Sequence, residues 1–350
     1  MTKARFVSVG CAPSSGSTLL SNLLDSLPFA VCGPEIDLWV PRDYFTGFAR
    51  IKSRSFYTSR TPSPYQKRQK FKLKRLAPYG MDQHIVRTMV NESSNFEEFS
   101  ARFFDHFSRY RDKDCLLYVD KSPNNIHSAQ DFLDAFQDSF FIYLVRNPLY
   151  SLKSMIRRGI PPYLAISTWL VVEATFTMIK DHERVFAVKY ETLVKEPFAT
   201  VADLFGKLGI DYDATRIAAD FKENEYTSRS KETVSTWEFR SSDPVADGNR
   251  KKITDEDLRV LRALFNARVA QAYAKRYQLP EISFEETIHG PGYREQCAHY
   301  LKDQHQPVDP QSYFNRKSLR HVVSKFSQDL SHGDCSPFDF KTYLYPVMGC

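Results

Sequence analysis

A run of small residues near the N-terminus has the composition of a phosphate-binding turn. The stretch GCAPSSGST at residues 10–18 joins an apolar, strand-like segment to a leucine-rich, helix-like one. Such a junction directs backbone N–H groups and the positive end of a helix dipole at one spot. The stretch departs from GxxxxGK[ST], because five residues separate Gly10 from Gly16 and Ser17 stands in the place of the lysine. It therefore argues against an ATP or GTP kinase, and a turn without a ligand stays open as the alternative.

A second stretch, RNPLYSLKS at residues 146–154, follows the continuous apolar run FFIYLV. Such a run is typical of a buried parallel strand, so Arg146 is expected at the rim where open α/β sheets bind ligands. Ser154, eight residues on, is expected on the following helix. A planar guanidinium and a hydroxyl suit a second phosphate. The alternative is an arginine that caps a neighbouring helix.

Together, in this order and about 130 residues apart, the two stretches resemble the sulfotransferases that use 3′-phosphoadenosine 5′-phosphosulfate (PAPS). The family's PxSGTTxL-type loop corresponds to PSSGSTLL at residues 13–20, and its RxPxxxxxS segment to residues 146–154. VKYETLVKEP at residues 188–197 is similar to the family's YExLxxxP. The resemblance covers roughly Phe6 to Tyr277. The pattern is most similar to the branch of the tyrosylprotein sulfotransferases and their bacterial relatives.

The resemblance implies a fold, a reaction and a set of donor-binding residues. The fold is α/β, a parallel sheet flanked by helices of the P-loop-like sulfotransferase type. The reaction is transfer of the sulfuryl group of PAPS to a hydroxyl or amine, with no metal ion required. The 3′-phosphate would be bound by Arg146 and Ser154. The 5′-phosphosulfate would be bound by the loop residues Ser14, Ser15, Gly16, Ser17 and Thr18.

Two catalytic residues are implied by the same resemblance. Glu35, in CGPE at residues 32–35, matches the base of the family's CGEE-type stretch, and Lys121, in DKSP, matches the lysine of [N/E]K[D/T]P. Read alone, the first is a Gly-Pro turn with an exposed acid and the second a strand-end turn with a solvated lysine. If Glu35 is not the base, His84 or His127 is the next candidate. Further donor contacts are expected from Tyr190, Trp237, Arg250 and Lys251.

One position departs from the family. Between Pro13 and Ser15 the family usually has arginine or lysine, which contacts the bridging oxygen and the 5′-phosphate, and here Ser14 stands there. Losing a fixed cation at a developing negative charge can cost a few kcal/mol of transition-state stabilisation. Lys121, the basic segment 50–75 or the basic run 250–252 could compensate. Otherwise the chain is a weak or inactive relative.

The elements that must position these residues alternate between strands and helices, which favours a parallel sheet. We predict strands over residues 5–9, 115–119, 140–145 and 185–188, with a further short one starting at Ala30. We predict helices over residues 17–27, 96–110, 128–136, 150–157, 163–181, 198–208, 255–276 and 313–326. Thr254 is the expected N-cap of the helix over 255–276. The resemblance implies a sulfotransferase domain over 1–280, and we expect an extension over 281–350 packed on it.

Composition narrows the class of protein. Hydrophobic residues make up 42% and aromatic residues 14% of 350, which excludes a chain disordered throughout. We find no run of about 18 apolar residues and therefore expect no membrane span. The N-terminus lacks a signal-peptide pattern, so we expect a cytoplasmic protein. The six cysteines show no CxxC, and we expect reduced thiols without a metal.

Charge is concentrated in one segment. Residues 50–75 carry ten basic residues and no acid, while the whole chain has a formal charge of +6. With its prolines, residues 50–80 indicate an irregular insertion with at most one short helix, either a mobile solvated loop or a lid over an anionic ligand. One charged segment does not make a nucleic-acid-binding face, and we expect no nucleic-acid partner.

Three other functions stay open at this point. They are a relative that binds nucleotide without transferring sulfate, a nucleoside-phosphate kinase, and a non-catalytic protein whose basic segment docks nucleic acid or anionic lipid. The acceptor could be a small molecule, a sugar, a lipid or a peptide. The sequence does not identify it, and it does not fix the oligomeric state.

Overall fold

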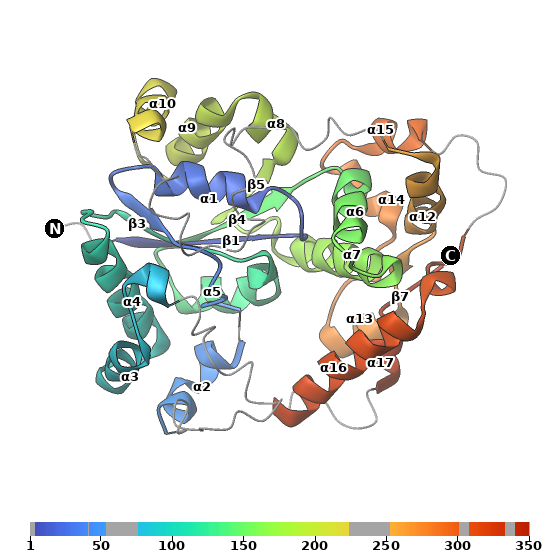
Figure 1. Ribbon diagram of the computed structural model, residues 1–350, viewed down its shortest axis with the longest axis horizontal. Coiled ribbons are helices and arrows are strands. Elements are labelled where there is room, and N and C mark those ends of the chain that lie inside the picture. The colour runs from blue at the N-terminus through green and yellow to red at the C-terminus, as the bar shows by residue number, and fades with distance from the viewer. Residues whose placement is uncertain are drawn as a thin grey trace. The chain divides into compact units, whose positions relative to one another are not determined.

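A five-stranded sheet is the centre of the first of two units in the computed structural model, which describes residues 4–40, 42–53, 76–223, 253–300, 308–332 and 340–349 (Figure 1). Unit 1 comprises residues 1–11, 16–144 and 182–247. Unit 2 comprises residues 12–15, 145–181 and 248–350. The loop at 12–15 therefore groups with unit 2, and the chain returns to unit 1 at Gly16.

The sheet has the order β2-β3-β1-β4-β5. Its strands are β1 Arg5–Cys11, β2 Ala30–Cys32, β3 Leu117–Lys121, β4 Ser139–Val145 and β5 Val185–Lys189. β1 is parallel to both β3 and β4, and β2 is parallel to β3. The fold class predicted from alternating strands and helices is thus confirmed, and β1 is central, so that the residues after it follow the middle of the sheet.

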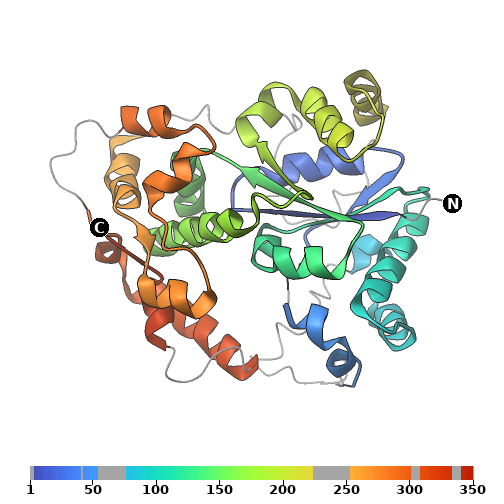
Figure 2. The ribbon, with the colours of Figure 1, turned by 180° about the vertical axis from the view of Figure 1, so that it is seen from behind.

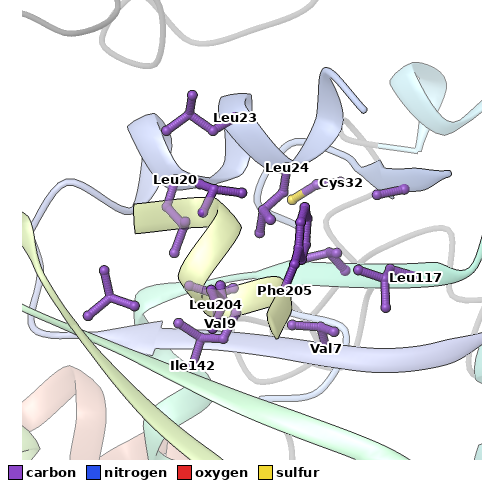
Figure 3. Packing of buried hydrophobic residues seen from close by; sticks show 14 of the residues in the cluster. Val7, Val9, Leu20, Leu23, Leu24, Cys32, Leu117, Ile142, Leu204 and Phe205 are labelled. Atoms are coloured by element: carbon purple, nitrogen blue, oxygen red, sulfur yellow. The ribbon is translucent and has the colours of Figure 1, made fainter. Parts of the chain in front are cut away.

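One face of the sheet packs against helices α1 and α9 (Figure 3). Val7 and Val9 of β1 meet Leu20 and Leu24 of α1 and Phe205 of α9 in this core. Successive strand residues point to opposite faces, so the odd-numbered positions of β1 form this layer. Burying each of these aliphatic side chains is worth roughly 1.5–3 kcal/mol, and this packing fixes α1 against the sheet.

The opposite face carries an aromatic core. Trp39 packs against Phe6, Phe104, Phe132 and Phe136, with ring centroids between 4.7 and 5.8 Å apart. The indole N–H of Trp39 donates to the Ser100 hydroxyl at 3.1 Å, which satisfies its buried polar group. Figure 2 shows α5 on the side of the sheet away from α1.

The helices of unit 1 flank both faces of the sheet (Figure 1). They are α1 Ser17–Asp25, α2 Arg42–Ser53, η2 Ala77–Tyr79, α3 Gln83–Glu92, α4 Phe96–Tyr110, η3 Pro123–Ser128, α5 Ala129–Ala135, α8 Tyr190–Lys195, α9 Pro197–Lys207 and α10 Ala214–Glu223. The helix predicted over 96–110 has those bounds. Its N-cap Asn95 accepts from the Glu98 N–H at 2.8 Å, and its phenylalanine stripe is buried.

Unit 2 is mainly helical. Its elements are α6 Pro148–Arg157, α7 Pro162–Ile179, α12 Asp255–Phe265, β6 Arg268–Val269, α13 Gln271–Tyr277, α14 Phe284–His289, α15 Arg294–His299, η5 Pro310–Tyr313, α16 Arg316–His332, α17 Phe340–Leu344 and β7 Val347–Met348. By length and composition α7 could cross a membrane, but 56% of it is buried inside the protein, as in the core helix of a globular domain.

The single helix predicted over 255–276 is wrong. The structure breaks it after Phe265, and β6 forms an antiparallel pair with β7 near the C-terminus. The Val269 N–H donates to the Ile282 carbonyl at 3.0 Å, and the Ala270 N–H donates to the Pro346 carbonyl at the same distance. Tertiary hydrogen bonds to distant residues thus override a locally helical sequence. The predicted N-cap Thr254 is present, within a capping box.

Smaller differences concern segments that the periodicity did not resolve. Helices α2, α3, α8, α10, α14, α15 and α17 were also not predicted. Most of the basic segment, residues 54–75, lies outside the described residues, as do Trp237, Arg250 and Lys251. The lid interpretation and the domain boundary at residue 280 stay predictions. The described cysteines, at positions 11, 32, 115 and 297, are free and buried, as expected of reduced thiols.

Candidate functional site

The loop after β1 ends in a left-handed glycine that begins α1. Gly16 is the N-cap of α1 with φ 91°, and its carbonyl accepts from the Leu19 N–H at 3.0 Å. Ser17 and Thr18 are the first two residues of the helix, Ser17 buried and Thr18 half-buried. No acidic residue lies in this first turn. The positive end of α1, next to two hydroxyl residues, favours an anion.

Tyr190 explains why residue 16 is a glycine. It begins α8 directly after β5 and is 5% exposed. A Cβ added to Gly16 would lie 2.3 Å from a carbon of the Tyr190 ring, and the left-handed backbone disfavours any side chain there as well. Tyr190 was predicted as a donor contact, and the structure places its ring against the loop.

Glu35 and Lys121 lie close together in unit 1. Lys121 is the last residue of β3, in register with Val9 of β1, and Glu35 follows β2 in an irregular stretch. The Lys121 Nζ lies 4.0 Å from a carboxylate oxygen of Glu35, and the side chains are 3% and 12% exposed. The exposed acid and solvated lysine of the alternative interpretation are therefore excluded. Charges this buried are costly to place without each other.

The thiol of Cys11, the last residue of β1, lies near the same charges. Burial raises the pKa of this thiol to about 12. A hydrogen bond with the Ser17 side chain and the positive charge of Lys121 act in the opposite direction, whereas Glu35 adds to the rise. The first residue of α1, Glu35 and Lys121 therefore all lie near Cys11, at the carboxyl ends of β1 and β3, where parallel sheets bind ligands.

Two arginines of unit 2 converge on Ser14; we call Ser14, Arg146 and Arg158 the Ser14 cluster. Arg146, directly after β4 and 7% exposed, donates to the Ser14 carbonyl at 2.7 Å. Arg158, the C-cap of α6, donates to the Ser14 hydroxyl at 2.8 Å. Ser14 itself has φ 69°, and Ser15 lies with its hydroxyl 3.4 Å from that of Ser151. The alternative, that Arg146 caps a neighbouring helix, fits less well than this loop contact.

Arg158 was missed in the sequence. It follows the predicted Ser154 by four residues, and residues four apart lie on one face of a helix. Ser154 is half-buried on α6, and its carbonyl accepts from the Arg158 N–H at 3.1 Å. A basic residue one helical turn after Ser154 was the signal that could have identified it. The compensating cation for Ser14 was instead sought at Lys121 and in the two basic segments.

Asp257 fastens α6 to α12 within unit 2. One of its carboxylate oxygens lies 3.1 Å from Arg157 and 3.7 Å from the Lys153 Nζ. Burial alone would raise the pKa of Asp257, but hydrogen bonds from Thr254 and the two cations together keep it below its ordinary value. The helix that carries Ser154 is thereby fixed at two of its positions.

Among the described residues, neither the two alternative bases, His84 and His127, nor any group of metal ligands adds a residue to the site. His84, on α3, and His127, in η3, are both exposed. Within the part of the chain that the structure describes, no three His, Cys, Asp or Glu side chains gather closely enough to bind a metal ion. That the reaction needs no metal stays a prediction.

A central parallel strand running through a glycine-capped loop into a helix defines a P-loop-like α/β protein. A model of the sulfotransferase family matches residues 7–214, more than half of the chain, and this chain belongs to that family. A sequence search of curated proteins found no match.

Similar solved structures are also sulfotransferases. The sulfotransferase domain of the Synechococcus PCC 7002 olefin synthase has a TM-score of 0.50 and 19% identity, over 74% of this chain and 94% of that one. The sulfotransferase domain from the curacin biosynthetic pathway gives 0.46 and 16%, over 74% and 96%. A sulfotransferase from Alicyclobacillus acidocaldarius gives 0.37 and 14%, over 76% and 92%. At this identity the first of these supports the fold alone.

Proposed function

We propose that this chain transfers the sulfuryl group of PAPS to a hydroxyl or amine of an acceptor. The observation that carries the proposal is the buried pair of Glu35 and Lys121, 4.0 Å apart at the carboxyl end of β3. In-line displacement at sulfur requires positioning, a base for the nucleophile and positive charge at the leaving oxygen. One carboxylate and one ammonium, buried side by side, supply the last two.

In the proposed reaction Glu35 accepts the acceptor proton as the acceptor oxygen or nitrogen bonds to sulfur. The bond from sulfur to the bridging oxygen breaks, and 3′-phosphoadenosine 5′-phosphate (PAP) leaves with the electron pair. Lys121 neutralises the charge that develops on that oxygen. Gly16, Ser17 and Thr18 bind the 5′-phosphate through the first turn of α1, and Tyr190 keeps the loop in shape.

In unit 2, we assign the 3′-phosphate to Arg146 and Ser154. Arg158 supplies the cation that the family usually has at the position of Ser14, because its guanidinium already donates to the Ser14 hydroxyl. A guanidinium in this place carries the charge and the donor geometry that an anion needs. Trp237, Arg250 and Lys251 stay proposed contacts from the resemblance alone. The cytoplasmic location and the acceptor class also stay proposals.

Calorimetric titration with PAP and with 5′-AMP tests the donor assignment without an acceptor. We expect PAP to bind about tenfold to a hundredfold more tightly, since each charge-assisted contact to the 3′-phosphate is worth ~1.5–3 kcal/mol. Ser154→Ala should weaken PAP binding and leave AMP binding unchanged. Equal affinity for the two nucleotides would overturn the assignment. PAP binding without any sulfate transfer would instead favour an inactive relative.

A further inference from the structure

Asp120 precedes Lys121 on β3 and points to the opposite face of the sheet, because neighbouring strand residues alternate. It is 1% exposed and stands in register with Ser8 of β1, which is equally buried. Asn125 of η3 donates to Asp120 from its amide at 3.2 Å. Within the described residues, one side-chain oxygen of each of these three residues has no hydrogen-bond partner. A buried carboxylate oxygen that no donor reaches is a costly arrangement, whereas a carboxylic acid gains an O–H to donate.

Asp120 is also bound to the segment that carries Glu35. Residues 33–40, which we call the Glu35 segment, contain no helix or strand, yet five of the eight are buried. Buried backbone groups need hydrogen-bond partners, and here side chains provide several of them. The Asp120 oxygen that accepts from Asn125 also accepts from the Trp39 N–H at 3.4 Å. Ser128 donates to the Trp39 carbonyl.

Further hydrogen bonds to the Glu35 segment come from the same region and from η2. The hydroxyl of Tyr79 donates to the Pro34 carbonyl at 2.5 Å, and Ser122 donates to the Asp37 carboxylate. Asp37 has φ 58°, a conformation that a non-glycine residue keeps only when its surroundings enforce it. Placement of Glu35 therefore depends on side chains of β3, η3 and η2.

The groups facing Asp120 determine which form of its carboxyl is favoured. Burial raises its pKa from 3.8 to about 7, and the negative charges of Asp37 and Glu35 add to the rise. Cys32, on the adjacent β2, interacts electrostatically with Asp120 and with Lys121. Hydrogen bonds from Asn125 and Trp39 act in the opposite direction. Ionisation thus places a further negative charge beside a segment that already carries two carboxylates.

We propose that Asp120 is a positioning residue for Glu35: its neutral carboxyl, on the face of β3 opposite Lys121, holds the Glu35 segment in place and loosens it on losing its proton. The role given to Glu35 rests on the proposed function. The hydrogen bonds of the segment do not, so the two can fail separately. When the Glu35 segment is in place, the buried carboxyl of Asp120 prefers its proton. The free energy that holds the segment in place therefore falls as pH rises from about 4 to about 7, and it does not fall further above that.

Hydrogen–deuterium exchange of peptides covering residues 33–40, corrected for intrinsic rates, tests the proposal on the full chain. In the natural protein we expect opening of the segment to rise by up to about tenfold per pH unit between pH 5 and 7, then to level off. Asp120→Asn keeps the shape and removes the proton, so its segment should stay protected at every pH. Asp134→Asn, the same change on an exposed position of α5, should keep the natural dependence. Protection of residues 96–110 shows that each variant is folded.

Two outcomes would overturn the role of Asp120: a segment whose protection does not change with pH, or the same change in Asp120→Asn. A second readout is release of sulfate from PAPS with water as acceptor. Its rate constant should fall from pH 5 to 7 in the natural protein, level off above that, and be flat in Asp120→Asn, with KM for PAPS unchanged in both. Failure to bind PAP would reject the donor assignment and leave the exchange result standing.

Discussion

The Glu35–Lys121 pair in unit 1 is almost completely buried, whereas the Ser14 cluster in unit 2 ends in Arg158, which is exposed at the end of α6. Glu35 of this pair lies in an irregular segment whose backbone depends on other side chains, and Lys121 ends β3. The Ser14 cluster uses long side chains reaching from a strand end and a helix end. The base and the lysine assigned to the transfer step are thus held in buried surroundings, whereas the Ser14 cluster includes an exposed arginine that is held by its hydrogen bond to Ser14.

This difference predicts where substitutions act on turnover and where they act on affinity. Glu35→Gln and Lys121→Ala should lower turnover by about a hundredfold or more, because a base or a transition-state cation is lost. PAP affinity should change by only a few-fold. Initial rates with PAPS and calorimetry with PAP separate the two effects. Full activity in Glu35→Gln would place the base elsewhere, with His84 or His127 as the next candidates.

Arg158→Ala should show the reverse behaviour. Losing one charge-assisted contact lowers PAP affinity by roughly tenfold to a hundredfold, and turnover at saturating PAPS falls less than affinity does. Arg294→Ala serves as the matched control. It removes an exposed arginine of the same unit, whose ion pair with Glu285 lies at the surface. Adding Ser14→Arg should restore part of the affinity of Arg158→Ala. No change in affinity on losing Arg158 would show that its contact with Ser14 is structural alone.

A smaller effect, on unfolding free energy, is expected at Asp257, which links α6, the helix of Ser154, to α12. Asp257→Ala removes the side-chain half of a capping box and two ion pairs, at a cost of about 1–2 kcal/mol in unfolding free energy. The pKa of Asp257 is lower in the folded chain than in the unfolded chain. Its contribution to stability is therefore present above the pKa of the unfolded chain and is lost as pH falls through the pKa of the folded chain. Urea unfolding at pH 7 and pH 3 should therefore show a difference from the natural protein that shrinks at pH 3. An equal difference at both values would assign the loss to packing.

The sequence predicted the parts of the fold that depend on local pattern. The helix over 96–110 has a capping residue, acids in its first turn and a phenylalanine every three or four residues, so its bounds could be assigned before the structure was known. The helix predicted over 255–276 is broken at residues 266–270, because β6 pairs there with a strand about eighty residues later. Periodicity carries no information about a partner that far along the chain.

The candidate site divides in the same way. Arg146 and Ser154 stand out by spacing, and Glu35 and Lys121 by resemblance. Arg158 needed the structure, because its link to Ser14 spans more than a hundred residues. Asp120 was quoted only as the neighbour of Lys121, since a carboxylate before a lysine in a sequence gives no sign of which face of the sheet it occupies.

Because Tyr190 contacts Gly16, the end of the loop after β1 depends on the start of α8, which is distant in sequence. The ring fills the volume that any larger residue at position 16 would need. Variation at the two positions is therefore coupled: a side chain at position 16 clashes with the ring unless the aromatic residue at position 190 is lost first, and its left-handed backbone stays strained even then. In a library of random variants, changes at the start of α8 should accordingly emerge as donor-affinity variants.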